Sequence, residues 1–345
     1  MSRKIPPLPL RLASQGICCA VGNSAPAAIA AMRAHLGHFS PTIFMDKANQ
    51  PIAGALLHQV SLTGDERLLH MIHMATEECL SALPLAPDSP LPMILLGSEG
   101  TGECSESQRE RMDRLLAACR PPQSRDPRTR WICVGKASIG EALNQAREIF
   151  SAPNAPEYVL VVGIDSFLEP EIFNHYIHAQ RILCSTNSDG FIPGEAGAAI
   201  ALSAKAGEGP GLWIEGIGQG FEPASPESAE KPLLAQGLSE ALRAALSEAD
   251  APQSDYAFQA HAVSGEQWFM KETALAVGRV MTQVAPGFDT RMICLSTGEI
   301  GAASGPLGLA WMGAEMALGT LGARGVLHLS SNNGLRTALA LNYRI

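Results

Sequence analysis

Residues 189–204, DGFIPGEAGAAIALSA, are the stretch of this chain that best indicates its fold. Three glycines and a proline occupy the first nine positions, and an uninterrupted apolar run follows from Ala198 to Leu202. Glycine permits positive φ or a close approach of another backbone, so the spacing predicts a tight turn with Glu195 inside it. A short apolar run after such a turn is typical of a core strand, buried on both faces at the centre of a sheet covered by helices.

The same stretch resembles the Asp-Gly-Phe-x-x-Gly-Glu-Gly-Ala-Gly turn of β-ketoacyl synthases, which are condensing enzymes of the thiolase superfamily. In that family the turn leads into the last strand of the first half of a duplicated fold. The resemblance implies an α/β protein with a thiolase-like duplicated α-β-α-β-α five-layer fold. Because residues 205–228 are rich in Gly, Pro, Glu and Ser, we divide the chain into an N-terminal half, 1–205, and a C-terminal half, 206–345.

Apolar runs and amphipathic segments alternate along the chain, as in a layered α/β fold with parallel strands. The predicted strands are 17–21, 92–97, 131–134, 158–163 and 198–202, then 212–217, 256–263, 292–296 and a hairpin of 325–330 with 337–342. The predicted helices are 25–34, 66–83, 105–120 and 138–150, then 233–249, 267–280 and 305–321.

Net charge and the lengths of the apolar runs indicate which partners and which cellular location to expect. The 345 residues are 46% hydrophobic and carry a net charge of −9, which argues against nucleic acid and mildly against docking an acidic carrier protein on a broad basic face. No apolar run is long enough to span a bilayer, and the N-terminus has prolines where a signal peptide needs a helical apolar stretch. We therefore expect a cytoplasmic protein without membrane insertion.

We expect no metal and no cofactor. The eight cysteines include no Cys-x-x-Cys pair, and we interpret Cys18, Cys19, Cys133 and Cys294 as reduced cysteines of buried strands. His70 and His73 lie one helical turn apart but have no third ligand in view. The glycine-rich turn GSEGTG, residues 97–102, continues with a glutamate instead of the Gly-Lys-Ser/Thr of a phosphate-binding loop.

The family resemblance implies decarboxylative Claisen condensation. That chemistry uses a cysteine nucleophile at a helix N-terminus, which lowers the thiol pKa and supplies oxyanion donors. It also uses two histidines, which hydrogen-bond the thioester carbonyl and stabilise the enolate.

His261 is the candidate for the first histidine. It ends a predicted strand, and Lys271 and Glu272 follow at the spacing of the family's His-Gly-Thr…Lys-Glu stretch, although Ala262 and Val263 replace the glycine and threonine.

Glu299 falls where the second histidine belongs, because STGEIGAASGPLGLA resembles the family's Gly-His-x-x-Gly-Ala-Ala/Ser-Gly stretch. An ionised carboxylate cannot donate a hydrogen bond and would repel an enolate. Glu299 could instead act as a general base, or simply cap the helix that follows.

The nucleophile position is less well defined. Ile139-Gly140-x-Ala142 resembles the helix after the family's active-site elbow, and counting back from it points to Ile132, one residue before Cys133. A one-residue slip would make Cys133 the nucleophile; otherwise Cys133 is a buried strand cysteine. The family's C-terminal Gly-Phe-Gly-Gly-Thr-Asn loop is reduced to Asn333–Thr337, and the segment before the nucleophile is reduced to residues 121–130.

From these departures we predict a β-ketoacyl-ACP synthase-like protein that has lost condensing activity and acts as a binding or scaffold subunit. It would be a homodimer, joined through a strand near the nucleophile position, with a protein partner. That partner would be a type VI secretion effector or a synthase subunit, as for a chain-length factor, with acyl carrier protein as another possibility. The alternative is an active 3-oxoacyl-ACP synthase or acyltransferase that uses Cys133 and His261, with Glu299 as base.

Overall fold

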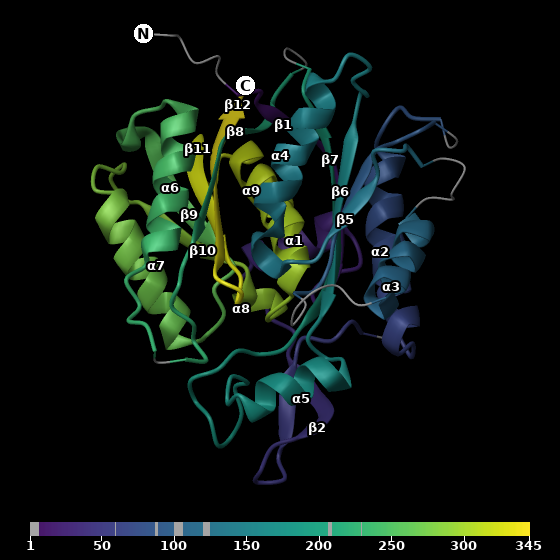
Figure 1. Cartoon of the computed structure of the whole chain (residues 1–345), viewed down its shortest axis with the longest axis vertical. Coiled ribbons are helices and arrows are strands. Elements are labelled where there is room, and N and C mark those ends of the chain that lie inside the picture. Colours follow the sequence, from purple (N-terminus) through teal and green to yellow (C-terminus); the bar gives the residue numbers. More distant parts are fainter. Residues whose placement is uncertain are drawn as a thin grey trace.

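A computed structural model describes residues 7–58, 60–86, 89–99, 106–119, 125–205, 209–228 and 230–345. These residues form a ten-stranded sheet and a separate two-stranded hairpin. The sheet is strongly folded, so that its two five-stranded halves face each other across a central layer of helices (Figure 1).

The two halves of the sheet have the same strand order. The first runs β5 (Arg130–Ile132), β4 (Met93–Leu96), β6 (Val159–Ser166), β7 (Glu195–Ser203), β1 (Leu10–Cys19). The second runs β10 (Asp289–Met292), β9 (Tyr256–His261), β11 (Arg324–Ser330), β12 (Leu335–Arg344), β8 (Gly211–Phe221). Each is the third, second, fourth, fifth and first strand of its half in chain order, so one topology occurs twice. Antiparallel pairing of Leu10 with Ile214 and of Arg11 with Trp213 joins the halves.

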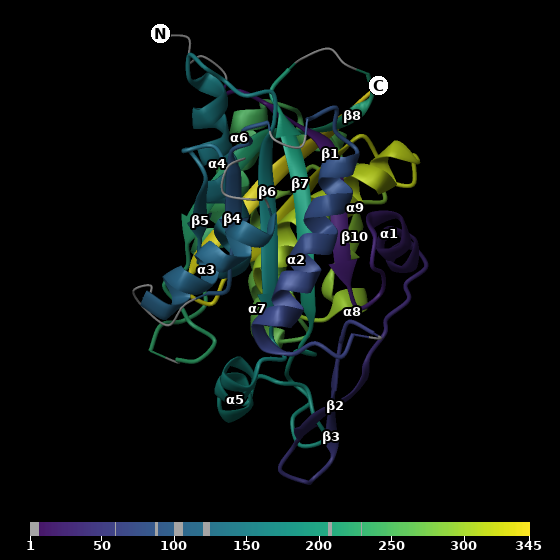
Figure 2. The ribbon, with the colours of Figure 1, turned by 90° about the vertical axis from the view of Figure 1, so that its right-hand side faces the viewer.

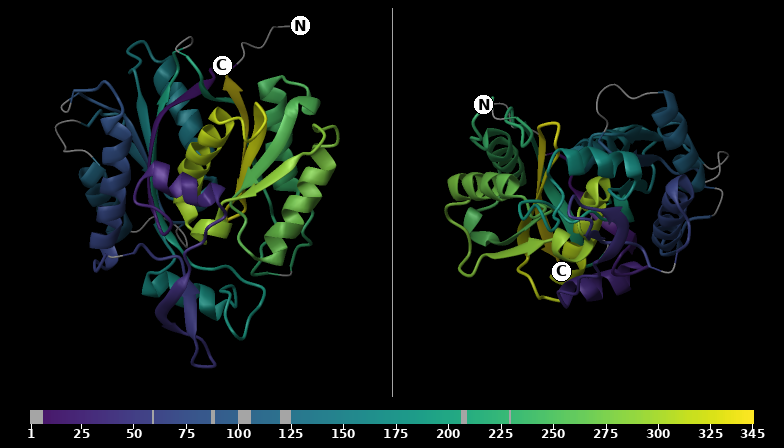
Figure 3. Two further views of the ribbon diagram at one scale, coloured as in Figure 1. Left: turned by 180° about the vertical axis from the view of Figure 1, so that it is seen from behind. Right: turned by 90° about the horizontal axis from the view of Figure 1, so that it is seen from below.

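Helices complete a five-layer arrangement. The outer layers are α2 (Gly64–Ser81) with α3 (Glu106–Cys119), and α6 (Gln236–Ala249) with α7 (Gln267–Val280). Between the sheets lie α1 (Ala25–Arg33), α4 (Ser138–Ser151) and α9 (Ser304–Ala317), as Figures 1 and 3 show. Of the 14 residues of α9, 12 are buried, because this helix has a sheet on either side. The layered α/β prediction is confirmed.

Residues 195–203, the apolar part of the glycine-rich stretch 189–204, form β7, an interior strand of the first half-sheet. All nine residues of β7 are buried, and β7 pairs antiparallel with both β1 and β6. Gly194 and Gly197 are needed for close packing: a Cβ would lie 2.3 Å from the Thr297 carbonyl oxygen and 2.6 Å from the Met71 carbonyl oxygen, respectively. Glu195 is the first residue of the strand, whereas the sequence analysis had placed it inside the turn.

Two predicted strands end earlier than expected. The apolar run 292–296 is strand only at Met292, because a short helix, α8 (Cys294–Thr297), begins two residues later. Apolar runs this short do not distinguish a strand from a helical turn. Likewise β5 ends at Ile132, which leaves Cys133 outside the sheet and only partly buried. The predicted turn 97–102 and loop 121–130 lie partly outside the described residues.

An unpredicted hairpin projects from one end of the molecule. It consists of β2 (Ser40–Met45) and β3 (Pro51–Gly54), and it lies near α5 (Pro170–His178) in Figure 2. Ile52, Phe173, Ile182 and Phe191 belong to a small separate core there. Within the described parts of the chain, no helix is both long and apolar enough to cross a membrane.

We expect Gly218→Ala to destabilise the protein by about 1–3 kcal/mol, as overpacking of a core does. Gly218 lies in β8, where α6 packs so closely that a Cβ would be 1.8 Å from the Ala241 carbonyl oxygen. Urea unfolding measures the loss. Gly278→Ala is the matched control: no atom lies within 4 Å of its Cβ position on α7, so added helix propensity should stabilise this variant by up to about 1 kcal/mol. Equal stability of the two variants would contradict this account of the packing.

Candidate functional site

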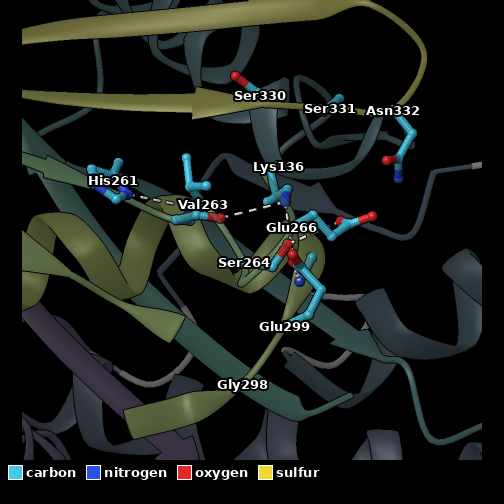
Figure 4. Close-up of polar contacts among 12 residues, drawn as sticks. Lys136, His261, Val263, Ser264, Glu266, Gly298, Glu299, Ser330, Ser331 and Asn332 are labelled. Carbon is cyan, nitrogen blue, oxygen red and sulfur yellow. Dashed lines mark hydrogen bonds and ion pairs between the residues drawn. The ribbon is translucent and has the colours of Figure 1, made fainter. Parts of the chain in front are cut away.

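Three segments that are far apart in the sequence meet in the interior. They are the turn that begins α4, the residues after β9, and the turn after α8 (Figure 4). Their central contact is an ion pair between Lys136 and Glu299, with 2.7 Å between Lys136 Nζ and Glu299 Oε2. Lys136 is 6% exposed and Glu299 2%, so the pair is shielded from solvent.

Backbone and side-chain hydrogen bonds fix Glu299 in position. Its N–H donates to the Ile192 carbonyl and its carbonyl accepts from the Gly194 N–H. The glycine-rich stretch 189–204 therefore holds the backbone of Glu299 in place. Its Oε1 accepts the Gly301 N–H at 3.0 Å, which agrees with the capping interpretation. Oε2 is thereby left to the ammonium.

Lys136 lies in η2 (Gly135–Ala137), the 3-10 turn at the N-terminus of α4. Its Nζ also lies 3.4 Å from the Ala262 carbonyl oxygen and 5.3 Å from the centre of the Phe269 ring. Burial alone would lower the pKa of Lys136, but the charge and hydrogen bond of Glu299 raise it above its usual value. Lys136 is therefore an ammonium ion at neutral pH.

His261 lies at the end of β9, opposite His328 of β11, and the two ring centres are 5.3 Å apart. Burial and the positive charge of Lys136 lower the pKa of His261 to about 4. The ring is thus neutral, and its Nδ1 accepts the Val263 N–H at 3.3 Å, which assigns the proton to Nε2.

Cys133 packs against a different core cluster, which includes Met71, Met112 and Leu115 from α2 and α3. A Cβ on Gly97 would lie 3.1 Å from its Sγ. Cys133 lies two residues before η2, the turn that begins α4. The residue of η2 that contacts Glu299 is Lys136. Sequence reasoning missed Lys136; the available signal was a lysine between a glycine and an apolar helix.

Glu99 and Arg181 hold the loop after β11 against this region. Glu99 accepts the Asn332 N–H at 2.9 Å and the Asn333 N–H, and Arg181 donates to Asn332 Oδ1 at 2.8 Å. Arg181 also binds Glu266 through two hydrogen bonds. Charged side chains thus fix the start of this loop, at Asn332 and Asn333.

Glu272 forms a buried ion pair with Arg336. Its carboxylate accepts hydrogen bonds from Arg336 Nε at 2.7 Å and from the Ser330 hydroxyl at 2.9 Å, and both members of the ion pair are at most 1% exposed.

Lys271 is exposed on α7. His73 pairs with Glu77 on the open face of α2, and within the described segments no three His, Cys, Asp or Glu residues are arranged to hold a metal ion.

Asp165 is another buried carboxyl group of this region. It accepts hydrogen bonds from the Ser98 hydroxyl at 2.7 Å and from the Ala302 N–H at 3.0 Å, and so links the two halves. Burial raises the pKa of Asp165 to about 7 in spite of these hydrogen bonds.

Comparison with solved structures places this arrangement in a known fold. A type II polyketide ketosynthase in complex with its acyl-carrier protein superposes with a TM-score of 0.77 at 12% identity, covering 97% of this chain and 99% of that one. The fold is that of the thiolase-like ketosynthases. A β-ketoacyl synthase from Burkholderia phymatum gives 0.69 at 16% identity, again with 97% and 99% covered. A ketosynthase with its chain length factor from Xenorhabdus doucetiae gives 0.73 at 12% identity, with 97% and 98% covered. Neither a family model nor a curated protein sequence matches the chain.

We expect Lys136→Met to cost about 3–5 kcal/mol, because it leaves Glu299 charged and buried in this ketosynthase-like core. Adding Glu299→Leu should recover most of the loss, since both charges are then gone. Urea unfolding of wild type, both single variants and the double variant measures the coupling. Lys205→Met is the control. Lys205 and Glu157 form an exposed ion pair, so this substitution should cost no more than about 1 kcal/mol. Strictly additive losses would show that the charges of Lys136 and Glu299 are not coupled.

The raised pKa of Asp165 has a consequence for stability against pH. The folded state holds this proton up to about pH 7, whereas the ordinary pKa of the group is 3.8. Between these values the folded state binds more protons than the unfolded chain, so this group makes stability fall as pH rises. We expect the free energy of unfolding of Asp165→Asn to fall less steeply with pH between pH 4 and 7 than that of wild type. Urea unfolding at several pH values measures this slope. Asp289→Asn, at a half-exposed site, should leave the slope unchanged. An unaltered slope in Asp165→Asn would refute the assignment.

Proposed function

We propose that this chain is a ketosynthase-fold protein without condensing activity, which acts as a binding or scaffold subunit. The observation that supports this most strongly is the buried Lys136–Glu299 ion pair. Condensation requires a nucleophile at the N-terminus of this helix and hydrogen-bond donors for the enolate. Lys136 stands at that N-terminus as a protonated amine, and both oxygens of Glu299 already accept hydrogen bonds, from Lys136 and from the Gly301 N–H.

The other candidate residues support the same proposal. His261 is neutral and retains an Nε2–H, and besides burial it is the charge of Lys136 that lowers its pKa. Cys133 packs with the α2 and α3 cluster, so the alternative of an active synthase using Cys133 and His261 gains no geometric support from the described contacts.

The partner is proposed to be a polypeptide. β5 is the terminal strand of the first half-sheet, with β4 as its neighbour, so its outer edge can pair with a second copy of this chain. The ketosynthase structures that this chain resembles include complexes with an acyl-carrier protein and with a chain length factor. For this chain, with its net charge of −9, we favour a synthase subunit or a type VI secretion effector over an acidic carrier.

Intact-protein mass spectrometry tests the loss of activity. Wild type is incubated with acyl-carrier-protein thioesters and, separately, with a thiol-directed ketosynthase inhibitor. We expect no stoichiometric adduct from folded protein that elutes at twice the chain mass of 36.4 kDa. Lys136→Cys/Glu299→His places a thiol and an imidazole at the same two positions and serves as the positive control. A stoichiometric wild-type adduct that disappears in Cys133→Ala would overturn the proposal in favour of an active synthase.

A further inference from the structure

The groups around the Lys136 ammonium form a recognition site for a primary amine. Within reach of Nζ are the Glu299 carboxylate, the Ala262 carbonyl and the face of the Phe269 ring. A carboxylate, a carbonyl acceptor and an aromatic face are the groups that bind ammonium ions in proteins. Figure 4 shows Lys136 pointing between the segments that carry His261 and Glu299.

The lysine and its acceptors come from opposite halves of the chain. Ala262, Phe269 and Glu299 all follow residue 205, whereas Lys136 precedes it. We propose that the second half supplies the groups that line a binding site for a primary alkylammonium ion, and that the first half fills this site with its own lysine side chain. This inference rests on the proposed function, because a site filled by Lys136 does not receive a thioester.

The acceptors are held without help from the lysine. The Gly301 N–H binds the other oxygen of the Glu299 carboxylate, and the Glu299 backbone pairs with Ile192 and Gly194. The Ala262 carbonyl follows directly on β9, and Phe269, which is 1% exposed, lies within α7. Removal of the Lys136 side chain therefore leaves a preformed, negatively charged space.

Truncation with chemical rescue tests the proposal. Lys136→Ala removes three methylene groups and the ammonium, which n-propylammonium replaces. We expect n-propylammonium chloride to raise the melting temperature of Lys136→Ala progressively with concentration, as for a ligand that binds the folded state. Methylammonium should have a smaller effect because it fills less of the space. Butyrate and n-propanol should give no rise beyond their effect on wild type, because neither carries a positive charge. Lys136→Met, which fills the space with a neutral chain, should not respond to any of these.

A second measurement uses wild-type protein, so the proposal stays testable where Lys136→Ala does not fold. Amine acylation followed by peptide mass spectrometry should modify Lys136 at least about tenfold more slowly than the exposed Lys47 and Lys271, because a buried, paired ammonium is a poor nucleophile. Glu299→Gln should accelerate the modification of Lys136 and leave Lys271 unchanged.

The outcomes separate this inference from the proposed function. A folded Lys136→Ala variant that shows no response specific to n-propylammonium overturns the ammonium site, as does acylation of wild-type Lys136 as fast as that of Lys271. Either result leaves the absence of condensing activity untouched. Wild-type turnover of acyl thioesters would instead overturn the proposed function.

Discussion

The buried ion pair between Lys136 and Glu299 determines how the centre of this molecule is organised. Each charge would be costly to bury alone, so the two segments that carry them must meet. Lys136 begins α4 in the first half of the chain, and Glu299 follows α8 in the second, so their contact fixes the position of one half against the other. The backbone of Glu299 also pairs with residues 192–194, which lead into the fully buried strand β7. Sheet, turn and ion pair thus form one connected structure.

This pair also decides what chemistry the site supports. Burial, together with the ammonium of Lys136, lowers the pKa of His261, so that ring is neutral. The carboxylate, accepting from Lys136 and from the Gly301 N–H, has no role as a donor to a developing negative charge. The interior of this ketosynthase-like fold therefore contains a satisfied charge pair, which supports the role proposed above.

Sequence reasoning succeeded where the signal was local and repeated. The turn before β7, the apolar strands and the amphipathic helices follow from periodicity and from glycine positions. Recognisable flanking residues singled out His261 and Glu299 as candidates. Lys136 was missed, since a single lysine near a glycine carries no periodic signal, and counting back from Ile139 passed over it to Ile132. The hairpin of β2 and β3 was missed because each of its strands has few apolar residues and contains a proline.

The order of apolar and polar residues along the chain specifies the layered α/β architecture, because it defines the buried strands and the amphipathic helices. Which charges meet depends on how these elements pack. Residues 136 and 299 are far apart in sequence, and neither has a local feature that names its partner. Their pairing results from folding two similar halves face to face, which brings the N-terminus of α4 against the turn after α8 in the buried interior, where one unpaired charge would be unstable.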